Sequence, residues 1–135
     1  MSLNVRGLRN REKRRSIFAY LKNQEANVSF LQETFSNSRD KKVWAAEWGG
    51  QIFYWHGSGH SKGVCILIRL IKPNSTLHAD VVELDTNGRF IILCLITQGE
   101  ASLNVVNVYA PTDNREWSEF LDSFSKQNHI VDWYF

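Results

Sequence analysis

Glu33 is the residue whose position in the sequence points most directly to chemistry. It follows an apolar stretch, residues 28–32, that has the composition of a short buried strand. A carboxylate at the end of a buried strand is costly unless a cation or a hydrogen-bond donor lies beside it. The simpler interpretation is that Glu33 ends the strand and faces water, because strands often end in polar residues. The ends of the other strands distinguish these two interpretations.

Two other predicted strands also end near a polar side chain. Asn4 belongs to a short stretch at the start of the chain, and Tyr109 closes the stretch 103–109. If both side chains converge with Glu33 at one rim, they are neighbours of the kind that a carboxylate at the end of a buried strand needs. Any reaction that uses Glu33 together with Asn4 and Tyr109 requires this convergence.

Length and composition restrict the class of protein. The chain has 135 residues, which is enough for one ordinary domain. Its hydrophobic content of 43% and charged content of 22% are those of a globular protein and exclude a disordered one. No linker or repeat divides the sequence, so we expect one domain over residues 1–135. The formal net charge of +2 is too small to indicate a nucleic-acid partner by itself.

A local cluster of basic residues is more informative than the total charge. It comprises Arg9, Arg11, Lys13, Arg14 and Arg15, with Glu12 as the local acidic residue. Such a cluster either faces a phosphate backbone or forms the solvated side of a helix. The sequence leaves both interpretations open.

Cysteine usage and hydropathy predict where the protein works. Cys65 and Cys94 lie inside apolar runs, and no His or Cys stands beside them at zinc-finger spacing. We expect them to be buried thiols in a reducing compartment. The start of the chain lacks the apolar region of a signal peptide, and the longest apolar run, residues 90–96, is too short to span a bilayer. These features predict an intracellular protein without a membrane partner.

Helical periodicity predicts three helices. Asn10 can cap the first, which runs to about residue 23. Trp44 and Trp48, four residues apart, suit a short helix that a Gly-Gly pair ends. Asp113 and Glu116 have the spacing of a capping box, and apolar residues at i, i+3, i+4 and i+7 follow them.

Apolar stretches separated by turn residues predict the strands. They lie at residues 2–5, 28–32, 51–55, 64–71, 78–84, 89–97 and 103–109, with another beginning near residue 129. The glycine-rich residues 56–63 predict a hairpin connection, although His56 and His60 are also weak candidates for metal ligands. Asn87-Gly88 predicts a type I′ hairpin turn. This order favours an α+β fold of mostly antiparallel sheet with helices on one side.

Four motifs, in this order, resemble those of a known family. They are Leu3-Asn4-Val5-Arg6-Gly7-Leu8, Leu31-Gln32-Glu33-Thr34, Lys62-Gly63-Val64-Cys65-Ile66-Leu67 and Asn107-Val108-Tyr109-Ala110-Pro111. The set resembles the exonuclease–endonuclease–phosphatase family, and within it the endonuclease of non-LTR (LINE-type) retrotransposons. Each motif is weak alone, but the ordered set is specific and extends over nearly the whole chain.

The resemblance implies a fold, an activity and roles for three residues. The fold is a four-layer α/β/β/α sandwich of the DNase I type, and the activity is Mg²⁺- or Mn²⁺-dependent cleavage of a DNA phosphodiester, in the nucleus for a retrotransposon. By position in the motifs, Glu33 matches the metal-binding carboxylate, Asn4 the amide that orients the metal centre, and Tyr109 the tyrosine near the scissile phosphate. Mg²⁺ prefers carboxylate, water and phosphate oxygens, and one or two protein carboxylates suffice.

Several family features have no counterpart in the sequence. The family expects a strand ending in Gly-Asp-Phe-Asn, but this chain reads Val131-Asp132-Trp133, so the role of that aspartate is not assigned to Asp132. A terminal Ser-Asp-His motif is also missing, and Thr112 stands where an Asn often follows Tyr-Ala-Pro. The four histidines lie in the wrong places to substitute; they are His56, His60, His78 and His129. We therefore expect the N-terminal half of a nuclease domain, truncated at its C-terminal side.

Such a half is expected to be weakly stable and catalytically incompetent. A bare apolar sheet face of roughly 1,000 Å² forfeits about 25 kcal/mol of burial, against a domain stability of about 5–15 kcal/mol. We therefore expect self-association, or a partner, through an uncovered sheet face. Removing one catalytic group costs about 10²–10⁴ in rate. Two alternatives remain: a nucleic-acid-binding module that does not cut, and a phosphatase-type member of the same superfamily.

Overall fold

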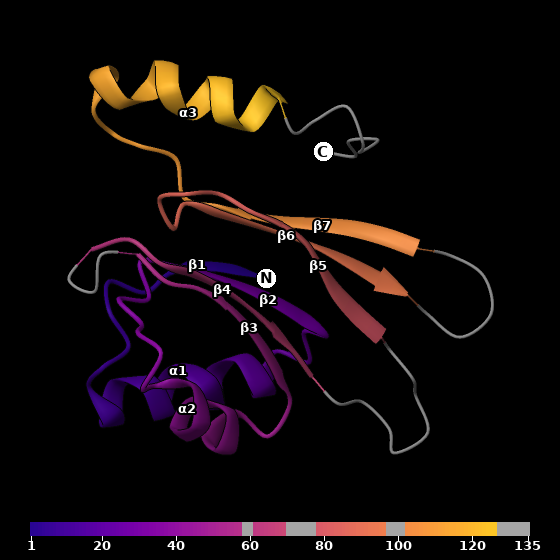
Figure 1. Ribbon diagram of the computed structural model, residues 1–135. Coiled ribbons are helices and arrows are strands. Elements are labelled where there is room, and N and C mark those ends of the chain that lie inside the picture. The colour runs from indigo at the N-terminus through magenta and orange to yellow at the C-terminus, as the bar shows by residue number, and fades with distance from the viewer. Residues whose placement is uncertain (58–60, 70–77, 97–101, 127–135) are drawn as a thin grey trace.

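The computed structural model describes residues 1–57, 61–69, 78–96 and 102–126. Two β-sheets pack face to face, with two helices outside the first sheet and one outside the second (Figure 1). The described chain is thus an α/β/β/α sandwich. The order of elements predicted helices on one side, whereas the family resemblance implied helices outside each sheet; the structure has the latter arrangement.

The first sheet brings two predicted site residues to the same edge. It contains β1 (Ser2–Asn4), β2 (Val28–Gln32), β3 (Gln51–Trp55) and β4 (Val64–Ile68), in the order β1-β2-β4-β3. β1 and β2 run parallel, with Asn4 opposite Gln32, and the other pairs are antiparallel. Because parallel strands end at the same edge, Glu33 emerges directly beside Asn4.

Helices α1 (Arg11–Asn23) and α2 (Lys41–Trp48) cover the outer face of this sheet (Figure 1). Asn10 caps α1 as predicted, since its side chain accepts a hydrogen bond of 2.9 Å from the Lys13 amide. Trp44 and Trp48 are both buried, which confirms their predicted packing role. α2 ends at Gly49, whose φ of 75° is the left-handed conformation of a helix C-terminus.

The second sheet is antiparallel and carries α3 on its outer face. It contains β5 (His78–Leu84), β6 (Phe90–Ile96) and β7 (Ser102–Val108), and α3 spans Asn114–Lys126. Phe120 and Phe124 of α3 pack against this sheet, with the Phe124 ring 5.5 Å from that of Phe90. Both faces of the described second sheet are therefore covered, one by α3 and one by the first sheet.

The core between the sheets is aliphatic. It is built from alternate residues of β4 and β6, namely Val64, Ile66, Ile68, Ile91, Leu93 and Leu95. The other side chains of β4 face α1 and α2, so β4 is buried on both sides. The Cys65 thiol lies in this second core, where burial raises its pKa, as expected for an unreactive thiol.

The hairpin between β5 and β6 differs from the predicted type I′ turn. Such a turn needs positive φ at both central residues, but Asn87 is not in that region, whereas Gly88 has a φ of 70°. The Asp85 carboxylate organises the loop instead. It accepts hydrogen bonds from the amides of Asn87 at 3.0 Å, Arg89 at 2.7 Å and Phe90 at 3.0 Å.

The start of α3 has one of the two side-chain hydrogen bonds of the predicted capping box. The Asp113 carboxylate accepts a hydrogen bond of 2.9 Å from the Arg115 amide, as a helix cap does. Glu116 does not reach back to the cap, because its carboxylate pairs with the Arg89 guanidinium. The predicted apolar face is also only partly buried: Trp117 and Leu121 are exposed.

The second layer exposes several large apolar side chains, although α3 and the first sheet pack on its sheet. The exposed large apolar residues there are Val81, Val82, Ile96, Leu103, Trp117 and Leu121. The predicted strand near residue 129 and the turn at residues 73–75 lie outside the described residues. No helix in the described part of the chain is long and apolar enough to cross a membrane.

Candidate active site

Asn4 and Glu33 are in direct contact at the edge where β1 and β2 end. The Asn4 side-chain amide donates a hydrogen bond of 3.0 Å to Glu33 Oε1. The side-chain oxygen of Asn4, Oδ1, accepts a hydrogen bond of 3.3 Å from the Arg6 backbone amide. The amide of Asn4 is therefore oriented at both ends, and it fixes one oxygen of the carboxylate.

Tyr109 reaches the same carboxylate from the second sheet. It follows β7, and its side chain forms a hydrogen bond with Glu33. The bonds from Asn4 and Tyr109 lower the pKa of Glu33 below its ordinary value of 4.5, against the smaller opposing effect of burial. Burial and the bond to Glu33 raise the pKa of Tyr109. At neutral pH the pair is thus a carboxylate and a protonated phenol.

The backbone around Glu33 is strained. Four of the five non-glycine residues with positive φ in the described chain lie in the loops at this rim: Arg6 at 47°, Glu33 at 55°, Phe35 at 53° and Lys62 at 66°. Side chains make this conformation unfavourable, and such residues cluster at functional sites.

Hydrogen bonds between the loops maintain these conformations. The Gly7 amide donates to the Glu33 carbonyl at 2.6 Å, and the Phe35 amide donates to the Lys62 carbonyl at 3.1 Å. Gly63 has no room for a side chain, because a Cβ there would lie 2.7 Å from Thr34 Oγ1. The loops after β1, after β2 and before β4 therefore form one connected rim.

An open hollow of about 370 Å³ lies beside Glu33 and Tyr109. Its other lining residues are Phe35, Ser61, Lys62, Arg89, Thr112, Asp113 and Glu116. Thr112 thus lies at the hollow, although the family resemblance led us to expect an Asn at this position. The hollow is large enough for a phosphate group and its neighbouring atoms.

Asn107 clamps the two sheets together behind the site. Its side-chain amide donates to the carbonyls of Leu31 at 2.9 Å and Cys65 at 2.7 Å, and its oxygen accepts from Gln32 Nε2 at 2.6 Å. Asn107 is 1% exposed, so these bonds are made without competition from water. They connect β7, which leads to Tyr109, to β2, which leads to Glu33. The signal for this role in the sequence is a polar residue inside an apolar strand, which does not by itself identify the partners.

Arg89 contacts both the ring and the backbone carbonyl of Tyr109. Its guanidinium carbon lies 5.7 Å from the centre of the Tyr109 ring, and its NH1 lies 3.4 Å from the Tyr109 carbonyl oxygen. The same guanidinium pairs with Glu116 of α3. Arg89 is 7% exposed, and it links α3 to the end of β7. One cation at the start of an apolar strand is a weak signal, and sequence reasoning missed this role.

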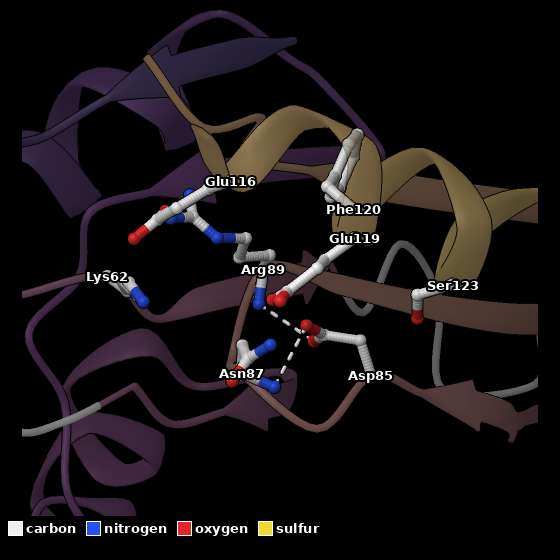
Figure 2. Close-up of a pocket in the computed structure, with 8 residues that line it drawn as sticks. All are labelled: Lys62, Asp85, Asn87, Arg89, Glu116, Glu119, Phe120 and Ser123. Carbon is white, nitrogen blue, oxygen red and sulfur yellow. Dashed lines mark hydrogen bonds and ion pairs between the residues drawn. The ribbon is translucent and has the colours of Figure 1, made fainter. Parts of the chain in front are cut away.

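A second, smaller hollow of about 120 Å³ lies under the N-terminal half of α3, and Figure 2 shows its lining residues. It includes three carboxylates, but two are already engaged: Asp85 by the hairpin amides and Glu116 by Arg89. In the described residues no group of three or more His, Cys, Asp or Glu side chains has the arrangement of a metal site. This hollow is therefore part of the packing of α3.

Comparisons with known proteins bear on this geometry. The model of the family described as "Endonuclease/Exonuclease/phosphatase family" matches residues 1–130. This chain belongs to that family. The Xenopus laevis protein named "Transposon TX1 uncharacterized 149 kDa protein" is 32% identical over 132 residues, which are 97% of this chain and 10% of that protein. The similarity to a transposon protein agrees with the retrotransposon branch predicted from the motifs.

Solved structures share the fold. The AP endonuclease LMAP from Leishmania major superposes with a TM-score of 0.75 at 19% identity, over 97% of this chain and 47% of that one. An AP endonuclease from Archaeoglobus fulgidus gives 0.65 at 18%, over 97% and 51%. TDP2 from Caenorhabditis elegans gives 0.62 at 20%, over 93% and 38%. The chain therefore spans about half of the length of these endonucleases and a tenth of the transposon protein.

The residues present fit the divalent cation that the family resemblance implies. Mg²⁺ keeps several waters and takes one or two protein carboxylates together with phosphate oxygens. Glu33 is ionised, half-buried and open to the larger hollow, and Asn4 adds an amide beside it. An open single-carboxylate position of this kind suits an ion that is completed by water and phosphate.

The two histidines in the described part of the chain, His56 and His78, do not contribute to this donor set. His56 Nδ1 lies 2.8 Å from Ser36 Oγ, and burial is the main cause that lowers the pKa of His56. His78 begins β5 and does not line the hollow. His60 and His129 lie outside the described residues.

One member of the basic cluster, Arg14, is buried and paired, whereas the other four are exposed. Arg14 is 4% exposed, and its guanidinium donates to both carboxylate oxygens of Glu47, at 2.5 and 3.0 Å, and to the Leu8 carbonyl at 2.8 Å. It also lies over the ring of Trp44. Arg11 approaches the same Glu47 at 3.8 Å. Part of the cluster therefore joins α1 to α2, which does not favour the alternative of a helix that binds nucleic acid without cutting it.

Proposed function

We propose that this chain forms the metal- and phosphate-facing half of a Mg²⁺- or Mn²⁺-dependent DNA endonuclease site, centred on Asn4, Glu33 and Tyr109. The observation that carries the proposal is the convergence of these three side chains, from three strands of two sheets, on one ionised carboxylate beside an open hollow. Because the chain is similar to a protein named as a transposon protein, we propose that its substrate is DNA in the nucleus.

Each of the three residues has a distinct part in this proposal. Glu33 holds the divalent cation, and Asn4 keeps the carboxylate oriented. A divalent cation held by Glu33 would supply charge neutralisation at the phosphoryl oxygens of a bound phosphodiester. Tyr109 keeps its proton at neutral pH, so its hydroxyl remains a donor that can turn from Glu33 to a phosphate oxygen.

We also propose that these residues alone do not complete a catalytic site. A phosphodiester hydrolase needs a group that takes a proton from the attacking water. Among the described residues at the larger hollow, Asp113 is engaged by Arg115 and Glu116 by Arg89, and the hollow has no histidine. Glu33 is assigned to the cation. The described residues at the hollow therefore bind the metal and the substrate without supplying this base, and on that ground we propose that the chain does not turn over.

Two measurements test the proposal. Titration of Mn²⁺, followed by its electron paramagnetic resonance, is expected to show a site that Glu33→Gln weakens at least about tenfold, the factor that ~1.4 kcal/mol of lost interaction gives. Glu12→Gln, an exposed carboxylate of α1, is the matched control and leaves binding unchanged. Equal Mn²⁺ binding by Glu33→Gln and the unaltered chain would overturn the metal assignment.

The second measurement addresses turnover. Supercoiled plasmid incubated with the chain and Mg²⁺ or Mn²⁺ is expected to remain intact. Nicking that disappears in Glu33→Gln would refute the proposed incompetence while supporting the assignment of the metal. Nicking that persists in Glu33→Gln would come from a contaminating nuclease or from another site.

A further inference from the structure

The cations near the rim fall into two groups. Arg89 and Arg14 are buried and paired with carboxylates, and they hold elements of the fold together. Arg6 and Lys62 differ, because among the described residues no hydrogen bond or ion pair engages either side-chain charge. Two unpaired cations beside a candidate phosphate site therefore need an explanation.

Arg6 lies on the β1 side of Glu33, because it follows β1, which pairs with β2. It is exposed, and it stands between Asn4, which binds the Glu33 carboxylate, and Gly7, which binds the Glu33 carbonyl. Its carbonyl accepts a hydrogen bond of 3.0 Å from Lys13 Nζ. The backbone of Arg6 is thus fixed from both directions. Its guanidinium makes no ion pair or hydrogen bond within the described residues, although its charge is close enough to Glu33 to help lower the pKa of that carboxyl.

Lys62 lies on the β4 side of Glu33, because it precedes β4, which pairs with the other edge of β2. It lines the larger hollow with Glu33 and Tyr109, and the smaller hollow with Asp85 and Glu119 (Figure 2). Its carbonyl accepts the Phe35 amide, and Phe35 is two residues beyond Glu33. The loops of Arg6 and Lys62 are therefore each bonded directly to the segment that carries Glu33.

Both residues adopt a backbone conformation that a glycine would adopt more easily. Their φ values are 47° and 66°, and each is followed by a glycine with a φ of 89°. A side chain makes this backbone conformation unfavourable, and residues in such conformations cluster at functional sites. The two cationic residues are thus attached to the rim on either side of Glu33 by backbone that hydrogen bonds between the loops hold in place.

We propose that Arg6 and Lys62 are two phosphate-binding positions, which hold the nucleic-acid phosphates on either side of the phosphate at Glu33. The inference rests on the proposed function, since it concerns the same site. It assigns the ligand by chemistry: a polyanion with regularly spaced phosphates, contacted through charge and not through bases. A guanidinium and an ammonium are the usual protein groups for such contacts.

The salt dependence of DNA affinity measures these phosphate contacts directly. Each phosphate that a protein neutralises in duplex DNA adds about 0.9 to the slope of log K against log salt concentration. Loss of Arg6 and loss of Lys62 are each expected to reduce the slope by about one contact, whatever the DNA sequence. A residue that only supports the fold would change affinity without changing the slope.

The experiment uses a fluorescent duplex oligonucleotide, without divalent metal, and anisotropy titrations at several KCl concentrations. The variants are Arg6→Asn and Lys62→Asn, because Asn tolerates positive φ and so removes the charge without adding strain. The matched controls are Arg15→Asn on α1 and Lys42→Asn on α2, which are exposed cations away from the rim. Thermal unfolding verifies that all four variants remain folded, and Arg6→Lys and Lys62→Arg are expected to retain the slope.

The outcomes separate this inference from the proposed function. A slope lowered by about 0.9 in each rim variant and unchanged in both controls supports the inference. Equal slopes for rim and control variants overturn it, and so does a lack of binding by the unaltered chain at about 50 mM salt, where phosphate contacts are strong. The metal assignment stands or fails separately, on Mn²⁺ binding by Glu33→Gln.

Discussion

Glu47 and Glu33, two of the carboxyl groups whose pKa is lowered, owe this to different causes. Glu47 of α2 is bonded to the Arg14 guanidinium, which is the largest cause of its lowered pKa. Glu33 is bonded to the neutral donors of Asn4 and Tyr109, and it opens onto a hollow. The charge of Glu47 is matched inside the fold, whereas the charge of Glu33 is stabilised but not neutralised. A carboxylate of the second kind is available to a cation.

The contrast extends to the surroundings of the two carboxylates. The α1–α2 contact around Glu47 is a regular helix pair with buried Trp44 and Trp48. The loops around Glu33 contain four non-glycine residues with positive φ, held by hydrogen bonds between loops. Residues near Glu47 should therefore affect the stability of the fold, and residues near Glu33 should affect binding.

Arg14→Met is expected to have the largest effect on stability. It removes a buried cation that bonds Glu47 and the Leu8 carbonyl, and it leaves these acceptors without their partner. Breaking a buried pair costs about 3–5 kcal/mol, and we expect about 3 because Glu47 can turn partly to water. Urea denaturation measures the free energy of unfolding.

Arg15→Met is the control for Arg14→Met, since Arg15 is the exposed neighbour on the same helix. It should change the free energy of unfolding by less than about 0.5 kcal/mol. An equally small effect of Arg14→Met would mean that the α1–α2 contact does not depend on the ion pair, and the contrast between the two carboxylates would be lost.

Asn107→Val is expected to be nearly as destabilising. It leaves the Leu31 and Cys65 carbonyls and the Gln32 amide without their partner between the two sheets. An unsatisfied buried polar group costs about 1–3 kcal/mol, and we expect about 2 kcal/mol overall. Thermal and urea unfolding both measure it. Asn104→Val, at an exposed position of β7, is the matched control. If the two variants unfold alike, Asn107 does not clamp the sheets.

The sequence predicted most of the elements and much of the site, for local reasons. Caps, periodicity and turn residues indicate α1, α2 and the strands, and motifs at strand ends indicate Asn4, Glu33 and Tyr109. Arg14 was assigned to a basic cluster, because its partner Glu47 is 33 residues away on another helix. A contact between residues that distant leaves no periodic signal. The role of Asn107 was not predicted for the same reason, since its acceptors lie 76 and 42 residues away.

The hairpin at residues 85–88 shows a different limit. Asn-Gly favours a type I′ turn, but the Asp85 side chain offers three amides a competing acceptor and changes the conformation of the loop. The exposure of Trp117 and Leu121 shows a third limit of prediction from the sequence. An amphipathic pattern predicts which face of α3 is apolar, but not how much of that face its own sheet covers.

Glu33 and Glu47 should both contribute to the pH dependence of stability, and the two contributions should have the same sign. A carboxyl group whose pKa is lowered by folding stabilises the folded state above its unfolded pKa, near 4.5 for Glu. This stabilisation is lost as the pH falls through the lower, folded-state pKa. Urea unfolding measured between pH 7 and pH 3 should therefore show a smaller loss of stability for Glu33→Gln and for Glu47→Gln than for the unaltered chain.

The two variants should differ at pH 7. Glu47→Gln removes the partner of a buried arginine, so it lowers stability throughout the pH range. Glu33→Gln removes a charge that has no cationic partner in direct contact, so the free energy of unfolding at pH 7 should change by less than about 0.5 kcal/mol. A large loss at pH 7 in Glu33→Gln would make Glu33 a structural residue like Glu47.

Tyr109→Phe is expected to have a small effect on stability and a specific effect on Glu33. It removes one of the two hydrogen bonds that lower the pKa of this carboxyl, so that pKa should rise toward its ordinary value. Carbon-detected NMR of the side-chain carboxyl groups follows this titration, while the free energy of unfolding should fall by about 0.5–1.5 kcal/mol. Tyr20→Phe, on the exposed side of α1, should leave the Glu33 titration unchanged. An unchanged titration in Tyr109→Phe would mean that the phenol does not share the carboxylate with Asn4. The second sheet would then position Tyr109 near the hollow without preparing Glu33 for a cation, and the difference between Glu33 and Glu47 would rest on Asn4 alone.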